Sequence, residues 1–166
     1  MIPPIKILLT GDVTDDKLID VVVDSIYGLV AEKIDLRKYT PIEEAILLVW
    51  HVFGLVSVNG FAGLFSDEIE GDPEYRRSLA AFNRIGATKA AFCFAELFDL
   101  YGKTDHQKSF DKRADEFAET NKEELFMLEG AFLDAEPEII SNLAKYIRDH
   151  RREFRTVQWV DGHPLS

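Results

Sequence analysis

The feature that most constrains the fold is a helix start followed by a long apolar run. Thr40 offers a capping hydroxyl, Pro41 suits the first helical position and Glu43 the third, so each satisfies or exploits an amide that would otherwise lack a partner. The run that follows, from Ala45 to Val58, has only three interruptions. A helix that is apolar nearly all round must be covered on every side. We therefore expect a helix from residue 40 to about Val56 at the centre of a core built by other helices.

Helical periodicity and helix-start signals recur along the rest of the chain. From about Asp15 to Glu32, apolar residues return at three- and four-residue steps and share one face. Asp72-Pro73-Glu74 repeats the start signal, and Gly86 is a natural stop. Further helices are expected from about Thr88 to Tyr101, from about His106 to Ala118, after a cap at Asn121 and after Glu136-Pro137.

The two ends of the chain have a different pattern. Ile5 to Leu9 and Thr156 to Val160 are rich in residues that favour strands, and their pairing is a hypothesis. We find no internal repeat, linker or composition shift that would mark a domain boundary. The sequence thus predicts an all-α fold, a single-domain helical bundle of about seven to eight helices over residues 1–166, with short extended segments at both termini.

The cysteine content and the apolar segments of the chain indicate its cellular location. A single cysteine cannot form an internal disulfide, and no basic segment precedes an apolar one at the start, so we expect no secretory signal. The longest apolar run is shorter than the roughly 20 residues that cross a bilayer. These observations predict a cytoplasmic protein with no membrane association.

Charge narrows the class of partner. Thirty acids against nineteen bases give a net charge of −11, which opposes direct binding of nucleic acid or of an anionic membrane and favours a basic protein. Asp12, Asp16, Asp20 and Asp24 stand four residues apart. On a helix this is about 6 Å of rise per step, comparable to the phosphate spacing along a DNA strand within the reach of flexible side chains.

Acids gather in two later segments, and bases at the end of the last helix. Asp67 to Glu74 holds five acids and no base, Asp105 to Glu138 eleven acids and four bases, and Lys145 to Arg155 five bases and two acids. The candidate protein-binding face consists of Asp12, Asp16, Asp20, Asp24, Asp67, Glu68, Glu70, Asp111, Asp115, Glu116 and Glu119. A merely solvated face, with acids crowding helix starts, explains the same pattern, and both interpretations stay open. If the face is functional, binding should be directional.

No group of residues has the spacing of a catalytic or metal-binding site. The four histidines are scattered, and phosphate-binding glycine loops and nucleophile motifs are absent. We predict that the protein is not an enzyme and uses no metal or cofactor. His51 lies among large apolar residues and is interpreted as a core histidine with a backbone partner, with a buried functional imidazole as the alternative. Cys93 lies between Phe92 and Phe94, which indicates packing.

Two glycine turns, an apolar helix and a closing helix carry a resemblance to a known family. The segments are Val58 to Phe65 with its Asn59-Gly60-Phe61, Leu79 to Ala87 with its Ile85-Gly86-Ala87, Ala90 to Phe92, and Leu143 to Arg148. Over about residues 40–154 the chain resembles the bacterial DNA-mimic proteins and their many uncharacterised relatives. One glycine of the family's usual Gly-Gly pair is absent here. From the residues themselves, Asn59-Gly60 permits a positive φ and Phe61 restarts a helix, so Asn59, Gly60, Phe61 and Gly86 form a structural motif.

The resemblance implies an all-helical fold, often a dimer, and for the studied member the binding of a DNA-binding protein in place of DNA. Together with the charge, this favours a non-catalytic protein-interaction domain that presents an acidic face to a basic DNA-binding protein. The alternative is a small-molecule-binding protein or enzyme with a pocket near His51 and Asn59-Gly60. A dimeric accessory subunit is a third hypothesis.

Overall fold

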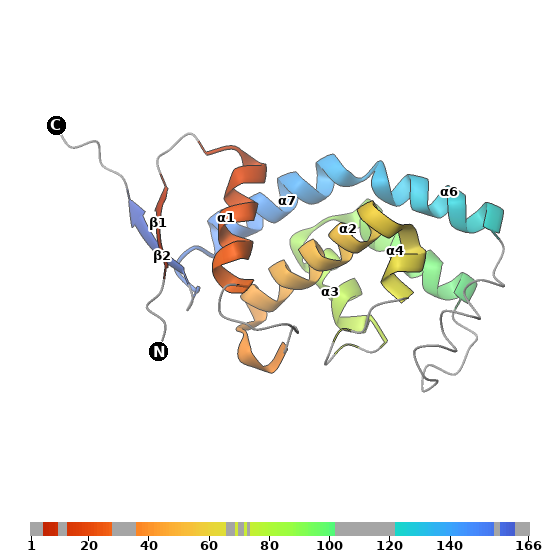
Figure 1. Ribbon diagram of the computed structural model, residues 1–166, viewed down its shortest axis with the longest axis horizontal. Coiled ribbons are helices and arrows are strands. Elements are labelled where there is room, and N and C mark those ends of the chain that lie inside the picture. The colour runs from red at the N-terminus through yellow and green to blue at the C-terminus, as the bar shows by residue number, and fades with distance from the viewer. Residues whose placement is uncertain are drawn as a thin grey trace.

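The apolar helix of the sequence is α2, Pro41–Phe65, and the other helices pack around it (Figure 1). The computed structural model describes residues 5–9, 13–27, 36–65, 69, 72, 74–101, 122–154 and 157–161. Every side chain from Ala45 to Val49 is buried, as are Val52, Phe53 and Val56. Burial on successive residues means that neighbours cover α2 on several sides, as its all-round apolar character predicts.

The helices differ in length from the expected ones mainly at their ends. They are α1 Asp15–Tyr27, the 3-10 helix η1 Leu36–Lys38, α2 Pro41–Phe65, α3 Arg76–Ile85, α4 Thr88–Tyr101, α6 Lys122–Leu133 and α7 Glu136–Asp149. The expected helix over residues 106–118 and the cap at Asn121 lie outside the described residues. The all-α prediction is confirmed.

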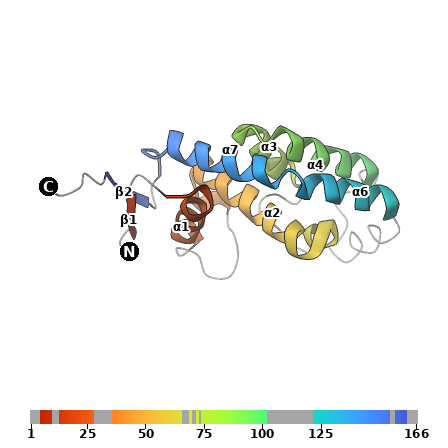
Figure 2. The same ribbon diagram turned by 90° about the horizontal axis from the view of Figure 1, so that it is seen from above.

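The arrangement consists of two long rows of helices with α3 and α4 beside them. Figures 1 and 2 show α6 and α7 following one another end to end above α2, with α1 crossing near one end of the row. α1 packs against α7 and α2, and α4 packs against α3 and α6. Neighbouring elements are therefore often distant in the sequence, and the core closes only when α6 and α7 fold back over α2.

The two extended ends form one small sheet at the edge of the bundle. β1, Ile5–Leu9, pairs in parallel with β2, Val157–Asp161, with Ile7 opposite Trp159. Figure 1 places this pair beside α1. The pairing that was only a hypothesis from the sequence is thus present, and it joins the first and last elements of the chain.

The start of α2 confirms the predicted capping box. The backbone N–H and the hydroxyl of Thr40 donate to Glu43 Oε2 at 2.9 and 3.0 Å, and the Glu43 N–H donates to Thr40 Oγ1 at 3.2 Å. Glu43 is fully buried. A buried carboxylate needs hydrogen-bond donors, and this reciprocal pair supplies two of them.

Replacing Thr40 with alanine is expected to lower the free energy of unfolding by about 1 kcal/mol, because both the cap and one donor to the buried carboxylate are lost. For a chain of this size that corresponds to a fall in Tm of roughly 3 °C, measurable by thermal circular dichroism. Thr40→Ser keeps the hydroxyl and should stay within a few tenths of a kcal/mol of wild type. An equal loss in both variants would contradict the capping role.

Three details of the helices differ from the sequence predictions. The helix expected to end near Val56 continues to the non-helical Gly60 (φ 63, ψ −168), and a second helical stretch, which restarts at Phe61 as expected, extends α2 to Phe65. α3 begins at Arg76 and not at the Asp72 signal, because Tyr75 adopts a left-handed conformation just before it. Phe92, expected on an apolar helix, is 63% exposed.

The length of α2 bears on whether this helix could span a membrane. By length and composition alone, residues Pro41–Leu64 are long and apolar enough to cross a bilayer, although the non-helical backbone of Gly60 interrupts this stretch. Half of that window is buried inside the protein. The core helix of a soluble protein meets the same criterion, and the absence of membrane association stays a prediction.

Candidate functional site

Three of the predicted acids form a row on the solvent side of α1. Asp16, Asp20 and Asp24 are all exposed, and the opposite side of the helix is buried through Leu18, Ile19, Val22, Val23 and Ile26. Residues four apart lie on one helix face, about 6 Å along the axis from one to the next. Within the part of the chain that the structure describes, none of these three carboxylates forms an ion pair. We call this row the α1 acidic face.

The remaining predicted acids cannot be placed. Asp12, Asp67, Glu68, Glu70, Asp111, Asp115, Glu116 and Glu119 lie outside the described residues. Their contribution to a protein-binding face stays a prediction. The α1 acidic face is therefore the part of the predicted site that can be analysed by geometry.

The acidic first helix and the basic last helix are neighbours, which the charge pattern of the sequence did not indicate. Arg148 Nη2 lies 2.7 Å from Asp15 Oδ1, and Lys145 pairs with Asp149 on its own helix. Asp15, an acid in the first turn of α1, thus anchors α1 to α7. Part of the basic end is neutralised within the fold, while the α1 acidic face remains open to solvent.

The Asn59-Gly60-Phe61 motif forms a sharp bend that a distant carboxylate closes. Gly60 has φ 63 and ψ −168, a region that side chains essentially exclude, so the predicted positive φ is confirmed. The Phe61 N–H, which opens the next helical turn, donates to Glu129 Oε2 at 2.9 Å. Glu129 comes from α6, so the bend in α2 and the position of α6 are coupled. The motif therefore has a structural role, which is to bend α2 and fix it against α6.

Gly86 forms the second turn of the motif. It is left-handed (φ 82, ψ 16), and the Gly86 and Ala87 N–H groups donate to carbonyls of the last turn of α3, which confirms the predicted stop. At the start of α4, Thr88 Oγ1 and the Lys89 N–H donate to the Glu138 carboxylate of α7 at 3.2 and 3.0 Å. The α3–α4 turn and the bend in α2 are thus both closed by carboxylates from the final helices, α7 and α6 respectively.

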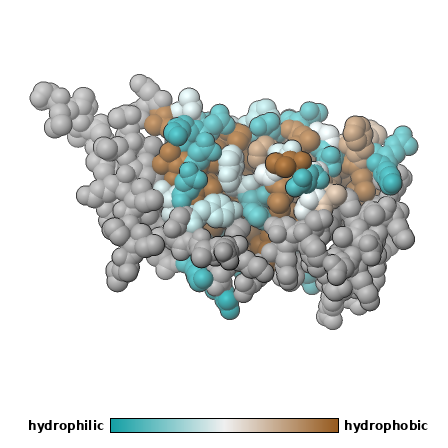
Figure 3. All heavy atoms as spheres, in the orientation of Figure 1, coloured by the Kyte–Doolittle hydropathy of each residue, from teal (hydrophilic) through white to brown (hydrophobic). Residues whose placement is uncertain are grey.

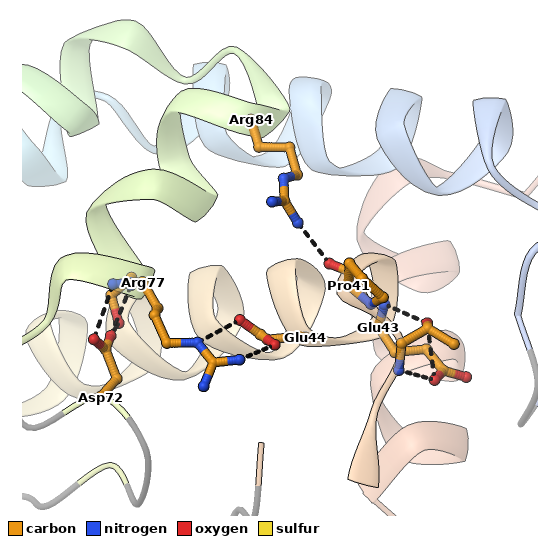
Figure 4. A network of polar contacts seen from close by, with 8 residues as sticks. Pro41, Glu43, Glu44, Asp72, Arg77 and Arg84 are labelled. Carbon is orange, nitrogen blue, oxygen red and sulfur yellow. Dashed lines mark hydrogen bonds and ion pairs between the residues drawn. The ribbon is translucent and has the colours of Figure 1, made fainter. Parts of the chain in front are cut away.

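A polar network that sequence reasoning missed joins α3 to the start of α2 (Figure 4). Arg77 makes two contacts with the Glu44 carboxylate, one of them 2.8 Å long, and Arg84 Nη1 donates to the Pro41 carbonyl at 2.8 Å. Asp72 accepts from the N–H groups of Arg77 and Ser78 and so caps α3. The partners are up to 43 residues apart, so local spacing gave no signal of them. A pocket of about 170 Å³ lies against this network.

The alternative site near His51 and Asn59-Gly60 does not form one cluster. His51 and Gly60 are nine residues apart on α2, about 13 Å of helix rise. His51 is half-buried with its Nδ1 3.4 Å from the Tyr27 hydroxyl, whereas the Glu129 carboxylate packs against Gly60. Within the described residues, His51 and Gly60 line neither the pocket beside Glu44 and Arg77 nor the pocket between α3 and α4.

Other chemistry-bearing residues lie in packed surroundings. Cys93 is buried, as predicted, and burial raises the pKa of its thiol, with the Glu138 and Glu96 charges adding to the effect. The thiol is therefore protonated near neutral pH, the opposite of what a nucleophile needs. Among the residues that the structure describes, no group of three or more metal-ligating side chains occurs.

Comparison with known proteins identifies the family. A family model described as DMP19-like protein matches residues 37–150. No curated protein and no solved structure matches the chain. The matched region runs from η1 to the end of α7 and contains both glycine turns, in agreement with the resemblance found over about residues 40–154; β1, α1 and β2 lie outside it. The match spans well over half of the sequence, and the chain belongs to the DMP19-like protein family.

Proposed function

We propose that the protein is a non-catalytic interaction domain of the DNA-mimic type that presents the α1 acidic face to a basic DNA-binding protein in the cytoplasm. The observation that carries the proposal is the row of Asp16, Asp20 and Asp24, exposed and without ion pairs in the described part of the chain. Family membership supports the general class of activity. It does not supply the face, because α1 lies outside the matched residues.

The energetics of the row favour a function over a purely structural origin. Like charges four residues apart on a helix destabilise it by a few tenths of a kcal/mol per pair. A basic partner would remove that repulsion on binding. The net charge of −11 would also attract such a partner and steer its approach. A structural helix needs only polar residues on its solvent side, and lysine or glutamine would serve.

The spacing of the row also sets a limit on the mimicry. Its carboxylates rise about 6 Å per step, whereas phosphates along one DNA strand rise about 3.4 Å each. The α1 acidic face alone therefore offers roughly half the charge density of a strand. We propose that the acids at residues 67–70 and 111–119 complete the surface.

The test is capture of proteins from a native lysate on the immobilised chain, with elution by duplex DNA. We expect a nucleic-acid-binding partner that DNA displaces and whose affinity falls steeply with salt. The variant Asp16→Asn/Asp20→Asn/Asp24→Asn should weaken the affinity roughly tenfold, since each rim charge contributes a few tenths to 1 kcal/mol.

A matched control makes the same change in net charge elsewhere. Glu124, Asp134 and Glu136 are exposed acids on α6 and around its turn into α7, and their amide variants remove three charges without touching the α1 acidic face. Equal weakening by both triple variants would show that only net charge matters. A captured partner that DNA does not displace, and that binds equally well at high salt, would sink the proposal.

A further inference from the structure

A second surface lies between α3 and α4, away from the α1 acidic face. A pocket of about 320 Å³ is lined by Glu74, Tyr75, Arg76, Leu79, Ala95, Phe98 and Asp99. Figures 1 and 2 show α1 toward one end of the bundle and α4 toward the other. We propose that this pocket, the α3–α4 pocket, receives the lysine or arginine side chain of a protein partner, in an interaction separate from that of α1.

The floor of the pocket is aromatic and held in place. The rings of Tyr75 and Phe98 stack with centroids 5.9 Å apart and planes inclined by 26°. Tyr75 has a left-handed backbone (φ 54, ψ 18), which is rare for a bulky residue, and its hydroxyl donates to the Leu64 carbonyl at 2.8 Å. Strained residues of this kind concentrate at binding sites, where the surrounding contacts fix them. Tyr75 is itself fully buried, so the half-buried Phe98 that stacks on it supplies the aromatic surface that the pocket exposes.

The rim of the pocket selects a cation. Arg76 Nε lies 2.6 Å from Glu74 Oε2, so these two charges neutralise one another. Asp99 is exposed and forms no ion pair within the described residues, which leaves the rim with a net charge of −1. Aromatic faces attract ammonium and guanidinium groups, and the methylene stem of such a side chain packs on apolar surface. Leu79 and Ala95 provide that surface.

The size of the pocket and the surface beside it point to a protein as the source of the cation. Sites for small molecules usually have volumes of about 300–1,000 Å³, so this pocket is at the lower limit and suits a single side chain. On the same face of α4 as Ala95 and Asp99, Phe92 is 63% exposed, and Leu100, next to that face, is 37% exposed. An anchor pocket flanked by exposed apolar side chains is typical of a protein interface.

Exposed apolar side chains are also present on α6, which packs against α4. In Figure 3, whose view faces α2 and α6, apolar patches lie between polar side chains at the end of the bundle that carries α6. On α6, Phe126 and Met127 are 77% and 70% exposed. A partner segment that combines a basic residue with apolar neighbours fits this surface, because it covers apolar area while its charge meets Asp99.

The experiment titrates the full-length, isotope-labelled protein with acetyl-Phe-Arg-Leu-amide and follows backbone amide signals by NMR. We expect saturable shifts at Ala95, Asp99 and Arg76 in the millimolar range. The same peptide with citrulline in place of arginine has nearly the same shape without the charge, and it should bind at least about threefold more weakly, since both the ion pair with Asp99 and the attraction of the cation to the aromatic surface are lost.

Two variants test the rim and the floor separately. Asp99→Asn should weaken binding about two- to fivefold, whereas Asp134→Asn, the same change on the α6–α7 turn, should leave it unchanged. Ala95→Leu should fill the pocket and abolish the shifts. The triple α1 variant should bind the peptide like wild type, so failure of the α1 proposal and failure of this one are distinguishable.

Three results would overturn the inference. They are equal binding of the arginine and citrulline peptides, shifts that map away from α3 and α4, and an unchanged affinity in Asp99→Asn. The affinity of Asp99→Asn for the arginine peptide does not depend on Ala95→Leu, so it tests the inference even if the Ala95→Leu variant fails to fold.

Discussion

Replacing Phe132 with alanine is expected to cost about 3–5 kcal/mol, a third or more of the stability of a typical domain. Phe132 is fully buried, and its ring meets those of Phe61, Phe82 and Phe94 with centroids 5.6, 5.7 and 6.4 Å apart. These rings come from α2, α3 and α4, so one side chain of α6 joins three other helices. Its removal leaves a cavity among rigid rings that cannot easily collapse.

Chemical denaturation with urea measures this loss directly. The matched control is Phe126→Ala on the same helix, where the side chain is 77% exposed, and it should stay within about 0.5 kcal/mol of wild type. Both variants remove a phenyl ring from α6 and change its helix propensity alike. A similar loss in both would mean that the cost lies in α6 itself and not in the aromatic cluster.

Replacing Gly60 with alanine is expected to lower the free energy of unfolding by about 3 kcal/mol. Its backbone (φ 63, ψ −168) falls in a region that costs a side chain about 1–3 kcal/mol. A Cβ there would also lie 2.3 Å from Glu129 Oε2 and push away the carboxylate that caps Phe61. A hydrogen bond to a charged group contributes about 1.5–3 kcal/mol, and part of this would be lost as well.

Two other glycines separate these effects when their alanine variants are compared by thermal unfolding. Gly54 lies within α2 with nothing within 4 Å of an added Cβ, so Gly54→Ala should stabilise the protein by up to about 1 kcal/mol. Gly86 has φ 82 and equally open space, so Gly86→Ala should cost about 1 kcal/mol from backbone strain alone. If Gly60→Ala cost no more than Gly86→Ala, the contact with Glu129 would have no energetic weight.

Glu129 provides the complementary measurement. In a double-mutant cycle, Gly60→Ala should cost less in the Glu129→Ala background than in wild type, because the carboxylate that the Cβ displaces is already absent. Glu129→Gln keeps an acceptor oxygen for the Phe61 N–H and should lose less than Glu129→Ala. Additive losses would show that the bend and the α6 cap are independent.

Local signals predicted the parts of the fold that depend on neighbours in sequence. The capping box at Thr40 and Glu43, the stop at Gly86, the positive φ of Gly60 and the bounds of α4 all follow from contacts within a few residues, and the structure confirms them. The burial of Cys93 followed from its apolar neighbours in the same way. These features recur because helix ends and turns have the same chemistry in any protein.

The same distinction between local and long-range contacts decides which candidate site was predictable from the sequence. The row of Asp16, Asp20 and Asp24 was evident from its four-residue spacing, and the structure shows it exposed. The α3–α4 pocket had no signal, because Tyr75 and Asp99 lie 24 positions apart and the left-handed conformation of Tyr75 is unusual for its residue type. Phe92 even suggested the opposite, since an aromatic residue on an apolar helix is ordinarily expected to be buried.

The sequence by itself thus determined an acidic, all-helical chain with a buried central helix, its glycine turns and its family resemblance. The tertiary structure decided which carboxylates are used inside the fold and which remain exposed on its surface. Glu129 and Glu138 look like ordinary surface acids in the sequence, yet they close the α2 bend and the start of α4. The physical reason is that such caps join residues 49–68 positions apart, and only packing of α6 and α7 against the earlier helices brings donor and acceptor within hydrogen-bonding distance.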